Sequence, residues 1–254
     1  MFSKYDIIVV GAGHAGCEAA AAGANMGSKT LLITMNMQTI AQMSCNPAMG
    51  GIAKGQIVRE IDALGGYSGI VTDKSMIQFR MLNRSKGPAM WSPRAQSDRM
   101  LFAQTWREML EQTPNVDFYQ DTVFNLMVEG GKVVGVVTGL GHKIYSNSVV
   151  LTNGTFLNGV IHIGEKNFGG GRVAEKAATG ITEQLVSIGF ETARLKTGTP
   201  PRIDGRSLDY SKMEEQKGDE EIVGFSYLNK AELKPQAQKS CWITYTNQEV
   251  HDIL

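Results

Sequence analysis

Apolar positions near the amino terminus predict a strand, a helix and a second strand, in that order. Residues 6–10 (DIIVV) form a short β-branched run of the kind found in buried parallel strands, and an alanine-rich segment reaching residue 26 favours a helix. Gly11, Gly13 and Gly16 stand between the two, and residues 29–34 form the second apolar run. This order is typical of a dinucleotide-binding unit.

Each glycine of this turn has a mechanical role in such a unit. Gly11 permits the tight turn, Gly13 lets the backbone approach a pyrophosphate, and Gly16 lets the helix pack onto the strand. The free N–H groups at the start of the helix face the anion. We therefore expect the whole loop to bind a nucleotide, and its residues are Gly11, Ala12, Gly13, His14, Ala15 and Gly16. The alternative is a glycine-rich turn in another α/β unit.

Two residues of this region leave alternatives open. An acidic residue that binds the ribose hydroxyls usually stands about 20 residues after the glycines, but this chain has Asn36 there. An asparagine can still hydrogen-bond a hydroxyl, although it brings no charge. His14 either contacts the pyrophosphate or flavin or is a solvent-facing spacer.

The loop after the second strand is the sharpest candidate for chemistry. Residues 38–55 are dense in Gly, Asn, Pro and Ser, with Cys45 in the middle, and loops of this composition often carry function. A helix is predicted at residues 52–64, and a thiolate at the start of a helix is a good nucleophile. Most free cysteines are instead small buried hydrophobes, so both interpretations of Cys45 stay open at this point.

The predicted helix at residues 52–64 has an apolar face. Ile57, Ile61 and Leu64 fall on one side of it at helical spacing, and two glycines after Leu64 end it.

A basic segment follows and is concealed by the neutral total charge. Between residues 74 and 107 there is one acidic residue, Asp98, and from 214 to 221 there are five acidic residues and one basic. Prolines and a glycine within residues 85–99 predict no regular element there, and Ser97 or Asp98 is the predicted N-cap of a helix reaching about residue 112. The seven basic residues of the segment are Lys74, Arg80, Arg84, Lys86, Arg94, Arg99 and Arg107.

Several of these cations are candidates for binding nucleic acid, because phosphate contacts supply much of the affinity of such complexes. The candidates are Arg80, Arg84, Lys86, Arg94 and Arg99. Ordinary solvated charge and ion pairs at a dimer interface are the alternatives. Trp91 is either a stacking platform for a base or a core residue.

Four β-branched runs predict an antiparallel meander, at residues 116–119, 122–128, 133–138 and 143–151. Two adjacent glycines, Gly130 and Gly131, join the middle pair as a hairpin. Such a meander is what a flavin-type nucleotide fold adds after its first βαβ unit.

The second half of the chain completes the expected domain organisation. The last meander strand is closed by Asn153, Gly154 and Thr155, which we expect near a cofactor, and residues 179–188 predict a helix. The composition changes at about residue 195. The sequence therefore predicts an α/β, FAD/NAD(P)-binding Rossmann-like domain of the glutathione-reductase type at residues 1–195, and the beginning of an inserted α/β domain at residues 196–254.

Composition excludes some classes of protein. Lysines plus arginines equal aspartates plus glutamates at 25 each among 254 residues. Cys17, Cys45 and Cys241 are too scattered for a disulfide framework or a metal site. No signal peptide or membrane-length apolar run is evident, so a cytoplasmic setting and no membrane contact are expected.

Longer motifs are far more specific than the glycines. They are GAGHAGCEAA, MSCNPAMGGIAKG, EIDALGG, QFRMLNRSKGPA, RAQSDR, GTFLNG and LKTGTPPRIDGR. Together they resemble the MnmG family, also called GidA, whose members modify the wobble uridine (U34) of certain tRNAs. The likeness extends from Ile7 to the end of the chain.

The resemblance implies a homodimeric FAD enzyme that works with the GTPase MnmE and uses NADH to reduce its flavin. Methylenetetrahydrofolate supplies a carbon unit, and glycine or ammonium supplies the amine of the 5-carboxymethylaminomethyl or 5-aminomethyl group. It also implies that residues 11–16 hold the FAD pyrophosphate, that Val123 contacts FAD, and that Cys45 takes part in the chemistry.

The match also shows what this chain lacks. Members of the family run to more than twice this length, and their second functional cysteine lies in an Arg-Tyr-Cys-Pro-Ser segment that does not occur here. Cys241 is not that residue. An amino-terminal fragment is therefore expected. The alternatives are an FAD-dependent oxidoreductase of small molecules and a non-catalytic nucleotide- or RNA-binding module.

Overall fold

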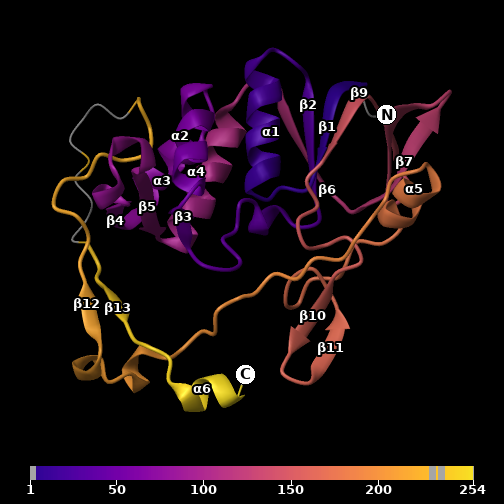
Figure 1. Ribbon diagram of the computed structural model, residues 1–254. Coiled ribbons are helices and arrows are strands. Elements are labelled where there is room, and N and C mark those ends of the chain that lie inside the picture. The colour runs from indigo at the N-terminus through magenta and orange to yellow at the C-terminus, as the bar shows by residue number, and fades with distance from the viewer. Residues whose placement is uncertain (1–3, 229–232, 234–237, 254) are drawn as a thin grey trace.

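A six-stranded mixed sheet is the centre of the computed structural model, which describes residues 4–228, 233 and 238–253 (Figure 1). The strands of the described chain are β1 (Tyr5–Val10), β2 (Thr30–Thr34), β3 (Ala48–Gly50), β4 (Met76–Leu82), β5 (Ser92–Ser97), β6 (Val116–Gln120), β7 (Val123–Glu129), β8 (Lys132–Thr138), β9 (Lys143–Leu151), β10 (Val160–Ile163), β11 (Lys166–Gly169), β12 (Glu214–Gln216) and β13 (Cys241–Ile243). The helices are α1 (His14–Asn25), α2 (Lys54–Ala63), α3 (Ser68–Ser75), α4 (Arg99–Gln112), α5 (Ile181–Ser187) and α6 (Gln248–Ile253).

The central sheet has the order β6-β2-β1-β9-β8-β7. Strand β1 pairs in parallel with both β2 and β9, and β2 pairs in parallel with β6. The predicted strands, the α1 helix and the βαβ unit are therefore confirmed. Strand β9 changes neighbours along its length, because residues 143–145 pair with β8 while the rest pairs with β1.

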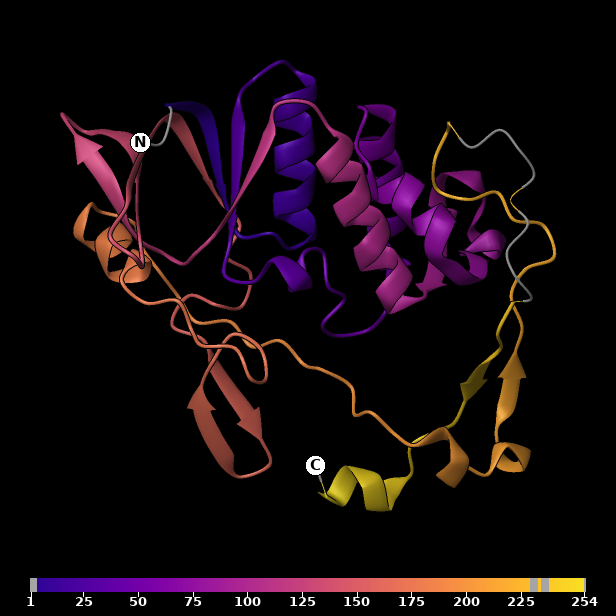
Figure 2. The same cartoon turned by 180° about the vertical axis from the view of Figure 1, so that it is seen from behind.

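The two faces of this sheet bury alternate residues, as the period of a strand requires. On one face Val9 and Leu32 pack with α1 and α4, including Phe102 and Trp106. On the other face Ile8, Val10, Leu31 and Ile33 pack with the meander and α5, through Val136, Ile144 and Ile181. Figure 2 shows α1 and α4 side by side on one side of the sheet, with α5 beside β7 on the other.

Three of the four runs predicted as an antiparallel meander form it, as β7, β8 and β9. The first run is β6, which pairs in parallel with β2 instead, so that part of the prediction is wrong. Its first hairpin closes with Glu129 opposite Lys132. Gly130 and Gly131 between them have φ values of 55° and 76°, a left-handed pair that matches the twist of the two strands. The helix expected at residues 179–188 is α5.

The expectation of no regular element within residues 85–99 is wrong. Strand β5 lies there, between β3 and β4 in a three-stranded sheet. Pro93 is tolerated because β3 pairs only with residues 94–96, so the proline lies beyond the end of that ladder. Asp98 is confirmed as the N-cap of α4, since its Oδ1 accepts from the amides of Met100 and Leu101 at 2.9 and 3.0 Å.

The predicted second helix is α2, but its apolar face is not the face that it buries. Ile57 is 53% exposed and Leu64 is 89% exposed, while α2 buries Gly55, Val58 and Asp62. A glycine and a carboxylate face the core because backbone segments approach α2 closely. A Cβ at Gly55 would lie 2.5 Å from the Pro93 carbonyl oxygen.

Other elements were not predicted. Helix α3 has no side-chain cap of its own; the carboxylate of Glu18 on α1 accepts from the amides of Tyr67 and Ser68 instead, at 3.1 and 2.6 Å. This long-range cap stabilises the positive end of α3. Strands β10 and β11, which pair as an antiparallel hairpin, were not predicted either.

Residues after α5 first run away from the central sheet, and a later part of the chain packs into the apolar cluster on the α1 side. The chain beyond α5 reaches β12 through two short 3-10 helices, Gly205–Ser207 and Tyr210–Lys212 (Figure 1). Phe225 is fully buried in the cluster on the α1 side, and the Asp73 carboxylate accepts from the amides of Phe225 and Ser226 at 2.8 and 2.9 Å. The domain boundary at residue 195 stays a prediction, although residues 219–228 pack on the first unit.

Candidate functional site

A cavity of about 530 Å³ lies at the carboxyl ends of β1, β2 and β9, where open α/β sheets bind their ligands. Its walls come from the glycine loop, the loop carrying Cys45, and residues 152–156. Every predicted cofactor residue except Gly16 lines it. These residues are Gly11, Ala12, Gly13, His14, Ala15, Asn36, Val123, Asn153, Gly154 and Thr155.

The glycine loop is shaped by close backbone contacts. Gly11 has φ of 100°, and a Cβ there would lie 2.6 Å from the Thr152 carbonyl oxygen. A Cβ on Gly16 would lie 1.8 Å from the Gly11 carbonyl oxygen, whereas one on Gly13 would meet nothing within 4 Å. Gly11 and Gly16 therefore serve the fold, and Gly13 leaves the backbone open to the cavity.

Two features of the cavity suit a bound nucleotide. Gly13 caps α1 without a side-chain hydrogen bond, so the first N–H groups of this helix are available to an anion. Asn153 Oδ1 is buried and has no hydrogen-bond partner among the described residues. Buried polar atoms are normally paired, and a ligand donor would satisfy this one.

Asn36, the candidate for binding the ribose, already uses its side-chain oxygen in a hydrogen bond within the protein. Asn36 Oδ1 accepts from the Gln38 amide at 2.9 Å, so a contact with a ribose hydroxyl would use the amide nitrogen. Val123 is 5% exposed and is the first residue of β7, where it lines the cavity. The roles of Asn36 and Val123 stay predictions.

Cys45 lies at the cavity wall, but it is not at the start of a helix as the sequence suggested. Its Sγ donates to the Gly198 carbonyl oxygen at 3.3 Å, and strand β3 separates it in sequence from α2. Cys17 is fully buried in α1, and burial raises the pKa of its thiol. Cys241 is half-buried, with its Sγ donating to Gln78 Oε1 at 3.2 Å. Cys45 is thus the thiol that the structure places at the candidate site.

Residues 6–254 match the family described as glucose inhibited division protein A. The chain belongs to this family. A relative from Cytophaga hutchinsonii, named tRNA uridine 5-carboxymethylaminomethyl modification enzyme MnmG, is 74% identical over 254 residues, covering 100% of this chain and 41% of that protein. A relative of the same name from Flavobacterium johnsoniae is 71% identical over 251 residues, covering 99% of this chain and 40% of that protein.

The solved structure of Aquifex aeolicus GidA matches with a TM-score of 0.94 and 45% identity, covering 98% of this chain and 42% of that one. The expected family and the expected Rossmann-like fold are therefore confirmed. The chain spans about two fifths of the length of the relatives that it matches.

Two cations at the GidA-family cavity were not predicted. Lys54 and Arg172 both line it, and burial lowers the pKa of each. The Arg172 guanidinium donates to Gln42 Oε1 and forms an ion pair with Glu175 at 3.5 Å. The sequence carried no signal for Arg172, because its glycine-rich surroundings fit any loop.

The predicted nucleic-acid residues do not form one cluster. Arg80 and Arg94 are direct cross-strand neighbours on β4 and β5, and Arg80 Nε is buried without a partner among the described residues. Like charges in this position repel, so a bound anion would stabilise them. Arg84 is already paired with Asp219 at 2.9 Å.

Three further residues of the basic segment differ in their surroundings. Lys86 is exposed. Arg99 is the first residue of α4, and its Nε is buried without a hydrogen-bond partner among the described residues. Trp91 is 43% exposed, with Nε1 donating to the Arg84 carbonyl at 3.2 Å, so it is not a core residue. The nucleic-acid roles stay predictions.

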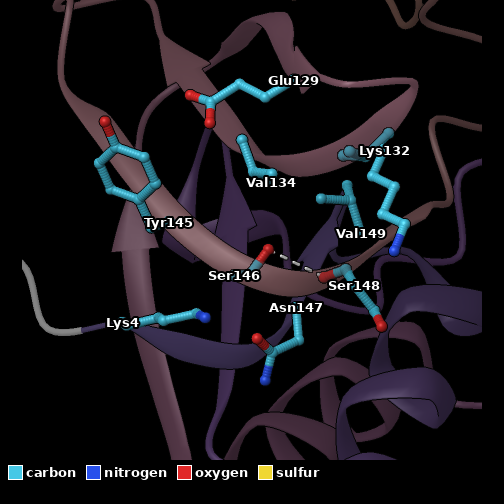
Figure 3. Close-up of a pocket in the computed structure, with 10 residues that line it drawn as sticks. Lys4, Glu129, Lys132, Val134, Tyr145, Ser146, Asn147, Ser148 and Val149 are labelled. Atoms are coloured by element: carbon cyan, nitrogen blue, oxygen red, sulfur yellow. Dashed lines mark hydrogen bonds between the residues drawn. The ribbon is translucent and has the colours of Figure 1, made fainter.

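A larger cleft of about 880 Å³ lies elsewhere, along β8 and β9. Lys4, Lys132 and Tyr145 are among the residues that line it, and the Ser146 hydroxyl donates to the Ser148 carbonyl at 3.0 Å (Figure 3). None of the predicted site residues lines this cleft. We assign the site to the smaller cavity, because the glycine loop, Asn153 and Cys45 converge there.

Neither a membrane span nor a metal cluster occurs within residues 4–228, 233 and 238–253. No helix there is long and apolar enough to cross a bilayer, and no group of three His, Cys, Asp or Glu side chains is placed to hold a metal ion.

His14 is not a solvent-facing spacer. Its Nε2 lies 3.1 Å from the Ala41 carbonyl oxygen, and its ring packs on Phe102 with centroids 5.2 Å apart. Since a carbonyl only accepts, Nε2 carries the proton. Burial first, and then the charge of Lys54, lower the pKa of His14 to about 4. His14 ties the glycine loop to the loop that carries Cys45.

This imidazole makes stability depend on pH. The pKa of His14 is 6.5 in the unfolded chain and about 4 in the folded protein. Between these two values the unfolded chain binds a proton at His14 and the folded protein does not, so protonation favours unfolding. Stability is therefore complete above pH 6.5 and falls, by on the order of 2–3 kcal/mol, as the pH drops towards about 4. Urea titrations at several pH values should show the loss, and His14→Gln, which can still donate to Ala41, should flatten this part of the profile. An unchanged profile in the variant would contradict the assignment.

Proposed function

We propose that this chain is the FAD-binding part of an enzyme that modifies the wobble uridine of tRNA. The observation that supports this proposal most directly is a single cavity that three features share. They are the start of α1, which has no side-chain cap, the Asn153 Oδ1 atom, which has no hydrogen-bond partner among the described residues, and Cys45. The names of its relatives support the tRNA reaction for those longer proteins, and this chain brings two fifths of such a protein.

The residues present fit FAD. The backbone N–H groups of the glycine loop would bind its pyrophosphate, since Gly13 leaves that backbone open. Asn36 would hydrogen-bond the ribose, Val123 would give an apolar contact, and residues 153–155 would complete the wall. Bound FAD would supply two-electron redox chemistry, with NADH as its reductant.

Cys45 would supply covalent chemistry beside the flavin. As a thiolate it can add to an electrophilic carbon, either of the uracil ring, whose 5-position is thereby activated, or of the methylene carrier. The carrier would be methylenetetrahydrofolate, with glycine or ammonium as amine donor. The further partners of the proposal are the GTPase MnmE and a second copy of the chain, in the cytoplasm.

Flavin binding is the first test. The purified protein is titrated with FAD, and the flavin absorbance that remains after removal of free cofactor is measured. We expect stoichiometric yellow protein, and a protein extended to the length of its relatives is the reference. If neither form binds FAD, the flavoenzyme proposal is wrong. An FAD oxidoreductase of small molecules would bind FAD but not tRNA.

Binding of tRNA should depend on the Arg80–Arg94 pair. Arg80→Ala with Arg94→Ala should weaken tRNA affinity and lower the slope of log affinity against log salt by about two, because two phosphate contacts are lost. Filter binding at several salt concentrations measures both quantities. Arg84→Ala is the matched control and should have a smaller effect, since Asp219 already neutralises it. Equal effects would mean that the cross-strand pair is not the contact.

A further inference from the structure

The segment after α5 contacts Cys45, although the regular structure within residues 189–207 is limited to a short 3-10 helix at Gly205–Ser207. Residues 189–207 are all exposed. Two of them contact Cys45: the Gly198 carbonyl accepts from its Sγ at 3.3 Å, and the Arg202 guanidinium donates to its carbonyl oxygen. Both polar ends of Cys45 are thus engaged by a segment more than 150 positions away.

This segment is fixed at both ends. At its start the Arg194 guanidinium donates to the carbonyls of Leu157 and Asn158 at 3.0 and 2.7 Å. At its other end Arg202 is held at Cys45. Pro200 and Pro201 lie between these points and restrict the backbone to extended conformations. We call residues 194–202 the strap.

The loop that carries Cys45 is held on its other side by the glycine loop. Ala41 donates its amide to the Ala12 carbonyl at 2.8 Å, and its own carbonyl accepts from His14. Cys45 therefore lies between the nucleotide cavity and the strap.

The contact with Gly198 has a chemical consequence. A carbonyl oxygen accepts hydrogen bonds and donates none, so only the protonated thiol makes this contact. The nucleophilic form of a cysteine is the thiolate. Cys45 must leave the Gly198 carbonyl before it can attack an electrophile.

We propose that the strap holds Cys45 in a protected state and that Arg202 is the positioning residue of this device. Arg202 fixes the Cys45 backbone under Gly198, and displacement of the strap frees the thiol. In the described structure Arg202 donates to a neutral carbonyl rather than to a carboxylate. Such a hydrogen bond is stronger than one between neutral groups but weaker than an ion pair, so it can hold the Cys45 backbone in place and still be broken. The inference rests on the proposed role of Cys45.

Alkylation of Cys45 by iodoacetamide tests the proposal in the 254-residue protein. Cys241→Ser removes the second accessible thiol, and Cys17 is buried. In this background Arg202→Ala should raise the alkylation rate of Cys45, located by mass spectrometry, by about tenfold, because a charge-assisted hydrogen bond is lost. Arg202→Lys should restore most of the protection, since an ammonium can still donate to the carbonyl.

Two further variants make the test decisive. Arg206→Ala is the matched control, because Arg206 lies on the same segment but pairs with Asp204 at 2.7 Å, and it should leave the rate unchanged. Arg194→Ala releases the other end of the strap and should also raise the rate, which protects the test if Arg202→Ala is unstable. Rates in Arg202→Ala and Arg194→Ala that equal the control, or fall below it, would overturn the proposal. Alkylation needs neither FAD nor tRNA, so this failure is distinct from failure of the proposed function.

Discussion

Gly13→Ala is expected to leave the protein folded while weakening FAD binding by at least about tenfold. Gly13 has φ of −74° and ψ of −175°, which any residue adopts, and the new Cβ would meet no protein atom within 4 Å. The methyl group would instead occupy the space through which a pyrophosphate approaches the backbone. Thermal melting measures the first effect, and titration with FAD measures the second.

Gly16→Ala provides the contrast within the same loop. Its Cβ would lie 1.8 Å from the Gly11 carbonyl oxygen, so the loop or α1 must shift, at a cost above about 2 kcal/mol. This variant should lose stability and FAD binding together. If Gly13→Ala bound FAD as well as the parent protein does, the cofactor would not approach the backbone at Gly13, and the assignment of the cavity would be wrong.

Trp106→Ala is expected to destabilise the protein by about 3–5 kcal/mol. Trp106 is fully buried on α4, where it belongs to the cluster between the helices and the sheet, with its ring centroid 6.0 Å from that of Tyr67. Truncation would leave a cavity that the rigid strands of the sheet cannot close. Denaturant unfolding followed by circular dichroism gives the change in free energy.

Two controls separate packing from other effects at Trp106. Its Nε1 has no hydrogen-bond partner among the described residues, so Trp106→Phe removes an unsatisfied donor with part of the volume and should cost only about 1–2 kcal/mol. Trp91→Ala should cost less than about 1 kcal/mol, because that ring is 43% exposed. Similar losses at Trp91 and Trp106 would contradict the burial argument.

Local patterns were sufficient for the central sheet. Residues 6–34 and the meander carry their own signals, because β-branched runs and adjacent glycines determine strand and turn over a few positions. Elements that depend on distant partners were missed. Helix α3 has its cap on α1, and α2 turns a glycine and a carboxylate towards the core because β5 and residues 224–227 pack there, which no periodicity within the helix reveals.

The candidate site divides in the same way. The glycine loop and residues 153–155 were predicted because each follows a strand of the parallel sheet, and such strand ends meet at one edge. Lys54 reaches the cavity from the first position of α2 and Arg172 from a glycine-rich loop, and neither position has a distinguishing pattern. The contacts of Cys45 with Gly198 and Arg202 join segments far apart in the chain, so only the folded structure places them together.

Strand β9 leaves part of its backbone open. Residues 146–151 pair with β1 on one side, and on the other side no strand of the described chain pairs with them. The N–H and C=O groups of this edge, with Val150 37% exposed beside them, form a ready template for any extended peptide. An extended segment that hydrogen-bonds with these groups would continue the sheet at β9.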